Sequence, residues 1–461
     1  MSRIRTGLAV LAGKSAGLAT RALRQGGGTA LPGLVAERID PRLVANLGRT
    51  LGCGRVMVTG TNGKTTTSRI IAAAFDAAGT PYIHNREGSN LMRGMASTLL
   101  AAAGPLGGIP GAANTAGLFE ADEATMPAAV PALQPRVIAF TNLFRDQLDR
   151  YGEVDTVAAL WRKALAGAPR DATLVLNADD PSVAELAAGW DGPVHWFGLD
   201  DRAFATSTAG AFDARWCPCG GDYRYDRRYF AHVGWWRCAR CERHRAEPST
   251  SGSEVSLALE RASFVVNGLG RIEMPLTGLY NVYNALAAIS AARAFGISAE
   301  AIRTGLRNVR PAFGRQEVVE LNGRRLRLFL AKNPAGANQV LLLLRELARS
   351  AGPVNVALLL NDRFADGQDV SWIWDVDHEL LAESVANCWA GGDRAEDLAV
   401  RLKYAGWPAP GRVAHEPATL LDAILADTKP GDNVFVIPTY TAMLDLRQEL
   451  LRRGAVAGAM E

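Results

Sequence analysis

The sequence predicts an α/β protein in which a mostly parallel sheet, covered by helices on both faces, is followed by a second α/β domain. Three observations predict this fold. A β-branched strand runs into a glycine-rich loop and then a helix over residues 56–75. Apolar runs alternate with helix-like segments beyond it, which is the pattern of a doubly covered parallel sheet. A polar, cysteine-rich stretch interrupts this alternation, which then resumes near Leu276.

The elements follow one another in a regular order. The apolar runs expected to form strands lie at residues 56–58, 115–119, 137–140, 174–176, 354–360 and 433–437. The segments with helical periodicity lie at residues 41–51, 68–75 and 154–165. We expect four units: an N-terminal helical segment (1–48), a central domain (49–310), an insertion within it (206–252) and a C-terminal α/β domain (311–461).

Composition excludes several classes of function. The 461 residues are 48% hydrophobic and 21% charged, which is typical of a soluble globular protein with large cores. A net charge of +3 does not predict a nucleic-acid partner, which normally requires a clustered basic face. No apolar run is long enough to span a bilayer.

The N-terminal segment predicts a helix that ends at a glycine-rich stretch, residues 26–33. Arg3 and Arg5 precede a short apolar run at residues 7–12, and Lys14 and Arg21 interrupt the N-terminal stretch of residues 1–23. This pattern fits an exposed helix, which we favour, or a basic amphipathic helix resting on a membrane surface. We therefore expect a cytoplasmic protein whose contact with the inner face of the membrane is peripheral at most.

The glycine-rich loop, residues 59–67, predicts a phosphate-binding site. Such a site needs inward-pointing N–H groups at a helix N-terminus, a lysine for the phosphates and a hydroxyl for Mg²⁺. Gly60, Gly63, Lys64 and Thr65 supply these groups. Because Val58 stands where the strict loop pattern has its first glycine, the loop is a variant of that pattern.

Four of the six cysteines predict a zinc ribbon in the insertion. Cys217 and Cys219 form one pair, and Cys238 and Cys241 form a second pair eighteen residues later. Four thiolates around Zn²⁺ leave no open position, so such a site is structural. His232 and His244 lie near enough in sequence to replace a cysteine, and unliganded cysteines are the alternative interpretation.

The phosphate loop resembles that of the Mur ligases and folylpolyglutamate synthases, which activate a carboxylate as an acyl phosphate and couple it to an amine. The likeness continues, in order, through residues 177–181, 278–288 and 314–317. It implies a Mur ligase-type ATPase domain that uses ATP and Mg²⁺, with Lys64 as a catalytic residue. The implied ATP-binding residues are Gly60, Thr61, Asn62, Gly63, Lys64, Thr65, Thr66, Asn281 and Arg315.

The resemblance also implies a magnesium site and several departures from the family. Glu120, at the end of a strand facing the loop, is our first choice to hold Mg²⁺ with Thr65, and Glu123 is the alternative; a solvated acidic turn would hold no metal. Gln147 and Tyr280 replace two family histidines, so the family's second-metal arrangement is not expected. Phe329 occupies the place of the aspartate that binds ribose, and no ribose ligand is assigned.

A narrower resemblance is to the MurT family, the ligase subunits of lipid II isoglutaminyl synthase. It rests on the insertion, on the position of the loop, which leaves no room for the usual nucleotide-sugar domain before it, and on residues 84–90, 142–147, 330–336 and 366–375. It implies ATP-dependent amidation of the D-glutamate α-carboxylate of the peptidoglycan stem peptide, on lipid II or a related muropeptide.

The ammonia is implied to come from a partner, a GatD-type class I glutamine amidotransferase. In this family an acidic residue orients the partner's catalytic histidine across the subunit interface, and the resemblance implies that Asp369 is that residue here. Cys53 lies before the first sheet strand and Cys388 in a helix-like segment, so neither is expected to be a glutaminase nucleophile. The alternatives are a stand-alone ligase that adds an amino acid to a folate or muropeptide, and a non-catalytic scaffold.

Overall fold

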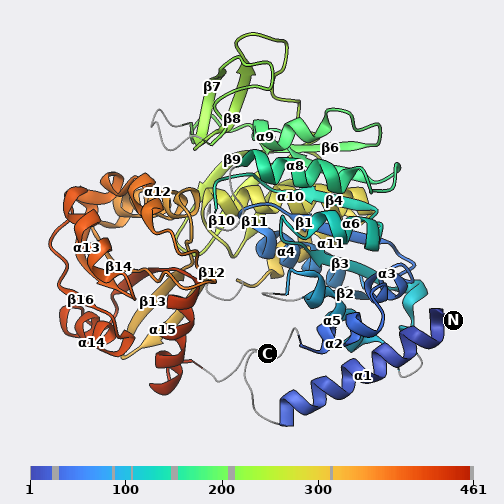
Figure 1. Ribbon diagram of the computed structural model, residues 1–461. Coiled ribbons are helices and arrows are strands. Elements are labelled where there is room, and N and C mark those ends of the chain that lie inside the picture. Colours follow the sequence, from blue (N-terminus) through green and yellow to red (C-terminus); the bar gives the residue numbers. More distant parts are fainter. Residues whose placement is uncertain are drawn as a thin grey trace.

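The computed structural model describes residues 2–22, 31–85, 89–104, 107–146, 154–205, 213–311 and 315–456. Gln147 and the side chain of Arg315 lie outside this description. Figure 1 shows the chain as a central sheet with its helices, a hairpin that projects from one end of it, and a separate C-terminal sheet with helices of its own.

The central sheet has nine strands in the order β11-β10-β9-β6-β5-β4-β1-β3-β2. The seven strands from β9 to β2 run parallel, and β10 and β11 continue the sheet antiparallel. Four predicted strands, β1, β3, β4 and β5, are confirmed. The strands are β1 (Arg55–Thr59), β2 (Tyr82–His84), β3 (Ala116–Glu120), β4 (Val137–Phe140), β5 (Thr173–Asn177), β6 (Val194–Leu199), β9 (Thr250–Leu257), β10 (Ala262–Val266) and β11 (Gly270–Met274).

Helices cover both faces of this sheet, as predicted. Because side chains alternate along a strand, Val56 and Val58 of β1 enter the core formed with α4, α10 and α11, and Met57 enters the core under α3, α5, α6 and α8. The helices are α1 (Ser2–Ala22), α2 (Leu31–Ile39), α3 (Leu43–Gly48), α4 (Lys64–Ala77), α5 (Met92–Ala102), α6 (Met126–Leu133), α8 (Val154–Leu165), α9 (Pro181–Ala184), α10 (Leu279–Phe295) and α11 (Ala299–Asn308), with short 3-10 turns at Ala112–Asn114 and Glu185–Ala187.

The insertion contributes a two-stranded hairpin, β7 (Tyr223–Phe230) and β8 (Val233–Cys238), at the top of Figure 1. Aromatic side chains fix it to the central domain. The Trp236 indole donates to the Ala178 carbonyl (2.9 Å) and the Tyr229 hydroxyl to the Leu199 carbonyl (2.8 Å). The central sheet resumes with β9 at Thr250, inside the range expected for the insertion.

The C-terminal domain is a six-stranded sheet in the order β12-β13-β17-β14-β15-β16. Only β12 is antiparallel to its neighbour. The strands are β12 (Arg315–Leu321), β13 (Arg324–Phe329), β14 (Val354–Leu359), β15 (Val385–Gly391), β16 (Arg412–Ala414) and β17 (Asn433–Pro438). The helices are α12 (Pro334–Ala351), α13 (Ala395–Tyr404), α14 (Pro417–Asp427) and α15 (Tyr440–Arg452), with 3-10 turns η3 (Ser371–Asp375) and η4 (His378–Ser384).

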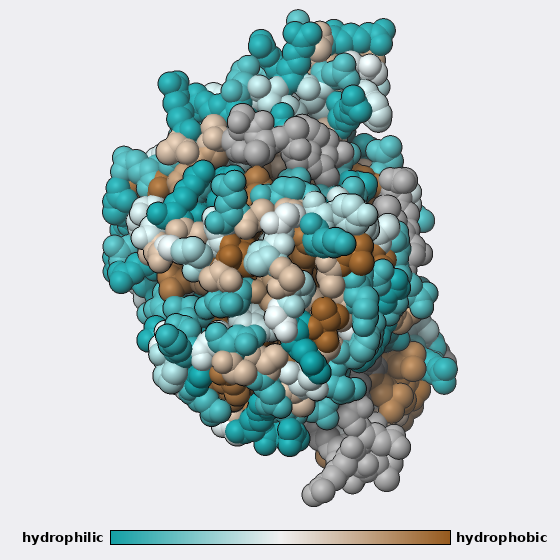
Figure 2. All heavy atoms as spheres, turned by 90° about the vertical axis from the view of Figure 1, so that its left-hand side faces the viewer, coloured by the Kyte–Doolittle hydropathy of each residue, from teal (hydrophilic) through white to brown (hydrophobic). Residues whose placement is uncertain are grey.

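One element of this domain was predicted wrongly. Cys388 lies in strand β15, between β14 and β16, and not in a helix. The face of the molecule seen in Figure 2 is mostly hydrophilic, with separate small apolar patches between the polar side chains. Among the helices that the structure describes, none has the length and apolar character needed to cross a bilayer.

Candidate functional site

The phosphate loop joins β1 to α4, and its conformation requires glycine at two positions. Gly60 has φ +137° and Gly63 has φ +88°. A Cβ at Gly60 would lie 2.0 Å from Thr141 Oγ1, and one at Gly63 would lie 2.0 Å from Asn284 Oδ1. The loop can therefore approach its neighbours closely, and it leads into the N-terminus of α4, where a helix favours phosphate oxygens.

The segment after β4 holds this loop in shape. Thr61 and Asn62 each bond to it through the main chain: Thr61 N donates to the Asn142 carbonyl (3.0 Å) and Asn62 N to the Asn142 Oδ1 (2.8 Å). The Phe144 N–H donates to Thr61 Oγ1 (2.9 Å). Thr61 is thus a supporting residue whose hydroxyl is engaged within the protein.

Helix α10 supports the loop from the other side. Asn284, whose amide oxygen lies against Gly63, donates through Nδ2 to Asn281 Oδ1 (3.1 Å). Asn281 in turn donates to the Thr277 carbonyl (2.8 Å). Asn281, a predicted ATP-binding residue, is thus connected to the loop through Asn284, to which the sequence analysis gave no role. Their spacing of three residues on one helix face was the available signal.

Lys64 is buried at the first turn of α4 beside an acidic cluster. Its Nζ donates to Glu123 Oε1 (2.9 Å) and to the Thr61 carbonyl (3.3 Å). Burial alone would lower the pKa of Lys64, but the carboxylates of Glu123, Asp122 and Glu120 outweigh burial and raise it. The ammonium therefore stays charged in a site of low dielectric, where it interacts strongly with an anion.

Glu120 is the last residue of β3. It lies opposite Val58, near the end of β1. The Asn85 side chain fixes its main chain: Asn85 Nδ2 donates to the Glu120 carbonyl and the Glu120 N–H donates to Asn85 Oδ1, both at 2.8 Å. The structure thus brings Glu120, Glu123, Lys64 and the buried Thr65 to one edge of the sheet.

The C-terminal domain reaches the phosphate loop directly. Asn62 and Asn333, 271 residues apart, exchange side-chain amide hydrogen bonds of 3.2 and 3.1 Å. Next to this pair, Lys332 Nζ lies 2.5 Å from Asp146 Oδ2. Phe329, by contrast, is buried in β13 with its ring centroid 6.1 Å from that of Phe435. The segment after β13 therefore closes over the loop, and Phe329 serves the core.

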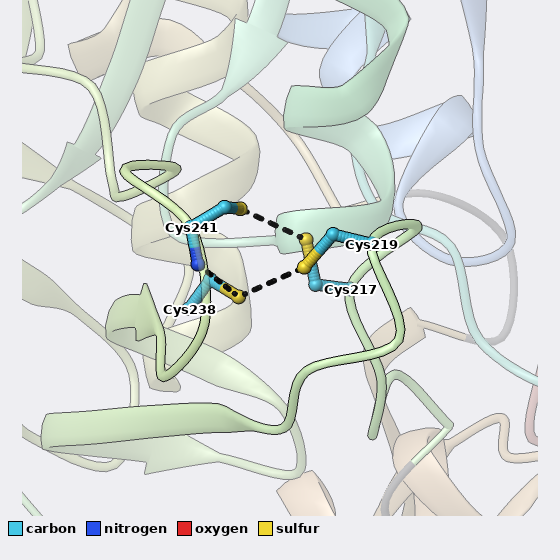
Figure 3. A group of neighbouring side chains, drawn as sticks. All are labelled: Cys217, Cys219, Cys238 and Cys241. Atoms are coloured by element: carbon cyan, nitrogen blue, oxygen red, sulfur yellow. Dashed lines mark hydrogen bonds between the residues drawn. The ribbon is translucent and has the colours of Figure 1, made fainter.

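The four cysteines of the insertion converge, and Figure 3 shows their sulfur atoms pointing toward one another from two loops. All four sulfurs lie within 4.8 Å of one another. Zn–S bonds of about 2.3 Å place tetrahedral thiolates about 3.8 Å apart, so the group fits a tetrahedral ion. The Arg240 and Cys241 N–H groups donate to Cys238 Sγ (3.3 and 3.4 Å), which favours its thiolate.

The two histidines considered as substitute ligands lie elsewhere. The buried His232 has its Nε2 3.3 Å from Asp180 Oδ1, and a His244 ring nitrogen contacts the Glu242 carbonyl (2.8 Å). Among the described residues the four cysteines are the one group of three or more His, Cys, Asp or Glu side chains whose ligand atoms converge as a metal ion requires.

Asp369 lies outside the phosphate site, on the surface of the C-terminal domain. Its Oδ1 accepts from the Ser371 N–H (2.8 Å), and hydrogen bonds from Ser371 lower the pKa of the Asp369 carboxyl. Phe364 and Trp374, in the same segment, are 81% and 51% exposed. The carboxylate is therefore ionised and exposed, in a segment that also exposes two large apolar side chains.

This segment also touches the central domain. Asp375, in η3, lies 3.3 Å from Arg145 Nη2, and Arg145 pairs in turn with Asp213. Arg145 directly follows Phe144, whose N–H donates to Thr61 of the phosphate loop. The Asp369 segment and the loop are thus joined by a short chain of contacts.

This fold, with its phosphate loop and closing C-terminal domain, is that of a Mur ligase. Residues 58–215 match the Mur ligase middle domain family, and residues 330–443 match the MurT ligase C-terminal family. The chain is 32% identical to the lipid II isoglutaminyl synthase (glutamine-hydrolyzing) subunit MurT of Streptococcus pneumoniae, over 99% of each chain. It is also 32% identical to the same subunit of Staphylococcus aureus, over 94% of this chain and 96% of the relative. The chain belongs to the MurT family.

Solved structures agree on the fold. A pseudomurein peptide ligase type C from Methanothermus fervidus superposes with a TM-score of 0.65 at 20% identity, covering 87% of this chain and 78% of its own. MurF from Acinetobacter baumannii gives a TM-score of 0.64 at 19% identity, covering 90% and 81%.

Proposed function

We propose that this chain is the ligase subunit of a lipid II isoglutaminyl synthase. It would convert the D-glutamate α-carboxylate of the peptidoglycan stem peptide to the carboxamide of D-isoglutamine. The observation that carries this proposal is the buried Lys64–Glu123 pair at a phosphate loop, in a chain that matches MurT relatives over their whole length.

The chemistry needs two steps. A carboxylate oxygen attacks the γ-phosphorus of ATP, ADP leaves, and an acyl phosphate forms. The nitrogen of ammonia then attacks the acyl carbon, the bond to phosphate breaks, and the proton that nitrogen loses ends on the phosphate, which leaves as hydrogen phosphate. The charged Lys64 and the N-terminus of α4 would stabilise the negative charge that develops on the phosphoryl oxygens.

The nucleotide site would use the loop and residues around it. We assign to ATP the residues Gly60, Asn62, Gly63, Lys64, Thr65, Thr66 and Arg315, with Thr61 and Asn281 supporting the loop that binds it. Thr65 and Glu120 would hold Mg²⁺, which would supply positive charge against the phosphates of ATP. Glu120 is preferred to Glu123 because Glu123 already pairs with Lys64. Asn281 would act through Asn284.

The ammonia would come from a GatD-type glutaminase bound to the C-terminal domain. Cys388 is buried, donates to the Pro408 carbonyl (3.1 Å), and has its pKa raised to about 11 by burial, so it is not an activated nucleophile. Asp369 is exposed and ionised in a segment that also exposes Phe364 and Trp374. It would complete the partner's Cys-His pair by orienting the histidine.

The cysteine cluster would bind structural Zn²⁺. Cys217, Cys219, Cys238 and Cys241 supply four thiolates, which leave no position for substrate. The ion would fix the open end of the hairpin, at the start of β7 and the end of β8. Trp236 and Tyr229 bond the same hairpin to Ala178 and Leu199 of the central domain.

The experiment compares glutamine-dependent with ammonium-dependent amidation by the two-protein complex. Asp369→Asn should lower the glutamine-dependent rate by about 100-fold or more and leave the ammonium-dependent rate unchanged. Asp422→Asn, at a 69% exposed aspartate of the same domain, is the matched control and should change neither rate. Loss of both rates in Asp369→Asn, or of neither, would contradict the partner role.

The alternative of a stand-alone amino acid ligase is tested in the same assay. If an amino acid replaces ammonium as acceptor and no glutaminase binds, the chain is an ordinary Mur-type or folylpolyglutamate-type ligase. Lys64→Ala should abolish ATP-dependent product with either nitrogen source while leaving the partner bound.

A further inference from the structure

Helix α1 turns its small residues toward the protein. Ala9, Val10 and Gly13 are buried against the rest of the chain. A Cβ at Gly13 would lie 2.6 Å from Leu100 Cδ2 and 2.9 Å from the Pro32 carbonyl. The inner face of α1 is thus closely packed on α2 and α5, and the helix is held firmly in place.

The outer face of α1 carries its large apolar side chains. Ile4, Leu8, Leu11 and Leu18 are 73%, 57%, 51% and 67% exposed, and their spacing places them on one face of the helix. A single exposed leucine is ordinary. A surface helix normally turns its large apolar side chains toward the core. In α1 four of them share the exposed face, and alanine and glycine lie on the buried one. These side chains form an apolar stripe that the described part of the chain does not cover.

The N-terminal segment that carries the stripe is basic in sequence. The first acidic residue of the sequence is Glu37, and the preceding residues include five basic ones, namely Arg3, Arg5, Lys14, Arg21 and Arg24. Arg5 Nε donates to the Ile39 carbonyl (2.5 Å) and Lys14 Nζ donates to the Ala103 carbonyl. These hydrogen bonds hold both side chains at the sides of α1. By helical periodicity Lys14 lies at one edge of the stripe.

We propose that α1 docks on an anionic lipid bilayer. An apolar face bordered by basic residues is the pattern of helices that lie in the membrane interface, and anionic headgroups complement a segment that has no acidic residue. Ile4, Leu8, Leu11 and Leu18 would enter the boundary between headgroups and acyl chains. This inference goes beyond the proposed function, and it concerns the bilayer surface and no particular lipid-linked substrate.

The position of α1 leaves the rest of the molecule accessible. In Figure 1 it lies along the outer edge of the central domain, on the opposite side from α13 and α14 of the C-terminal domain. A glutaminase on the Asp369 segment and a bilayer under α1 would therefore occupy different sides of the chain.

The test is flotation of the full-length protein with vesicles of phosphatidylcholine, with or without phosphatidylglycerol, and without any peptidoglycan precursor. The protein should bind the anionic vesicles, and salt should weaken the binding. Leu8→Glu combined with Leu11→Glu should lower the binding constant at least tenfold. Leu451→Glu, at a 44% exposed leucine of α15, is the matched control and should bind like the wild type.

Two further readouts keep the result unambiguous. Arg3→Gln with Arg21→Gln should lower binding about fivefold per charge and leave thermal unfolding unchanged. Amidation of a water-soluble muropeptide should be the same in all variants, which separates failure of docking from failure of the ligase. The proposal is overturned if the double glutamate variant floats like the wild type, if binding ignores lipid charge, or if that variant instead dissociates a dimer, because the stripe would then join two copies.

Discussion

The reciprocal amide pair between Asn62 and Asn333 makes a quantitative prediction about domain closure. Its two hydrogen bonds, of 3.2 and 3.1 Å, join the phosphate loop to the C-terminal domain. A hydrogen bond of this kind contributes about 1 kcal/mol net, so the pair should stabilise the closed arrangement by about 1–2 kcal/mol. A factor of ten corresponds to about 1.4 kcal/mol.

Asn333 has a second role that must be separated from the first. Its Oδ1 accepts from the Gly336 N–H (2.8 Å) and thereby caps α12. Loss of such a cap costs about 1 kcal/mol of folding stability. Serine at 333 can still cap the helix but cannot exchange amide bonds with Asn62.

The assay is a double-mutant cycle on kcat/KM for ATP. Asn62→Ala and Asn333→Ala should each lower it about 5- to 30-fold, and the double variant should be little worse than either single one, because the same pair is lost. In urea unfolding, Asn333→Ala should lose about 1 kcal/mol more stability than Asn333→Ser. If the two single effects multiply in the double variant, the asparagines do not act as a pair during turnover, and the reasoning is refuted.

Three other predictions follow from single sites. Gly63→Ala should abolish ATP-dependent amidation because its Cβ would meet Asn284 Oδ1 at 2.0 Å; nucleotide binding by calorimetry checks this, and near-normal affinity would contradict it. Cys219→Ser should lower the zinc content, measured by metal analysis, from about one ion per chain. It should also destabilise the hairpin, and unchanged stability on metal loss would contradict a structural site. Burial lowers the pKa of the His378 ring to about 3. The unfolded chain therefore takes up a proton first as the pH falls below about 6.5, and stability drops by up to about 1.4 kcal/mol per pH unit. His378→Leu should flatten this drop in urea titrations, and an equally steep drop in the variant would refute it.

Much of the central sheet could be predicted because its parallel strands are buried on both faces. β4 and β5 read as continuous apolar runs for that reason. Strands β9 to β11 were not predicted, because they follow directly on the cysteine-rich stretch that was assigned to the insertion, and β9 and β11 consist largely of small and polar residues.

Strand β15 shows how neighbours override local preference. Its residues around Cys388 include alanine, asparagine and glycine, which have low strand propensity. Parallel pairing with β14 on one side and β16 on the other fixes the extended conformation. A pattern read along the chain alone does not contain those partners.

In the candidate site, too, local features could be predicted from the sequence and features that depend on tertiary packing could not. Gly60, Gly63 and Lys64 could be predicted because a phosphate loop is local: strand, turn and helix are consecutive. The contact of Asn284 with Gly63, and that of Asn333 with Asn62, depend on how α10 and the C-terminal domain pack. No spacing rule spans the 271 residues between the two asparagines.

The proposed reaction activates a carboxylate as an acyl phosphate for attack by ammonia. The most direct measurement uses a muropeptide whose D-glutamate α-carboxylate carries a heavy oxygen isotope, with ATP and ammonium. One labelled oxygen should appear in inorganic phosphate for each amide formed, and Lys64→Ala should form neither product. Amide formation that leaves the label out of phosphate, or that proceeds without ATP, would contradict the account.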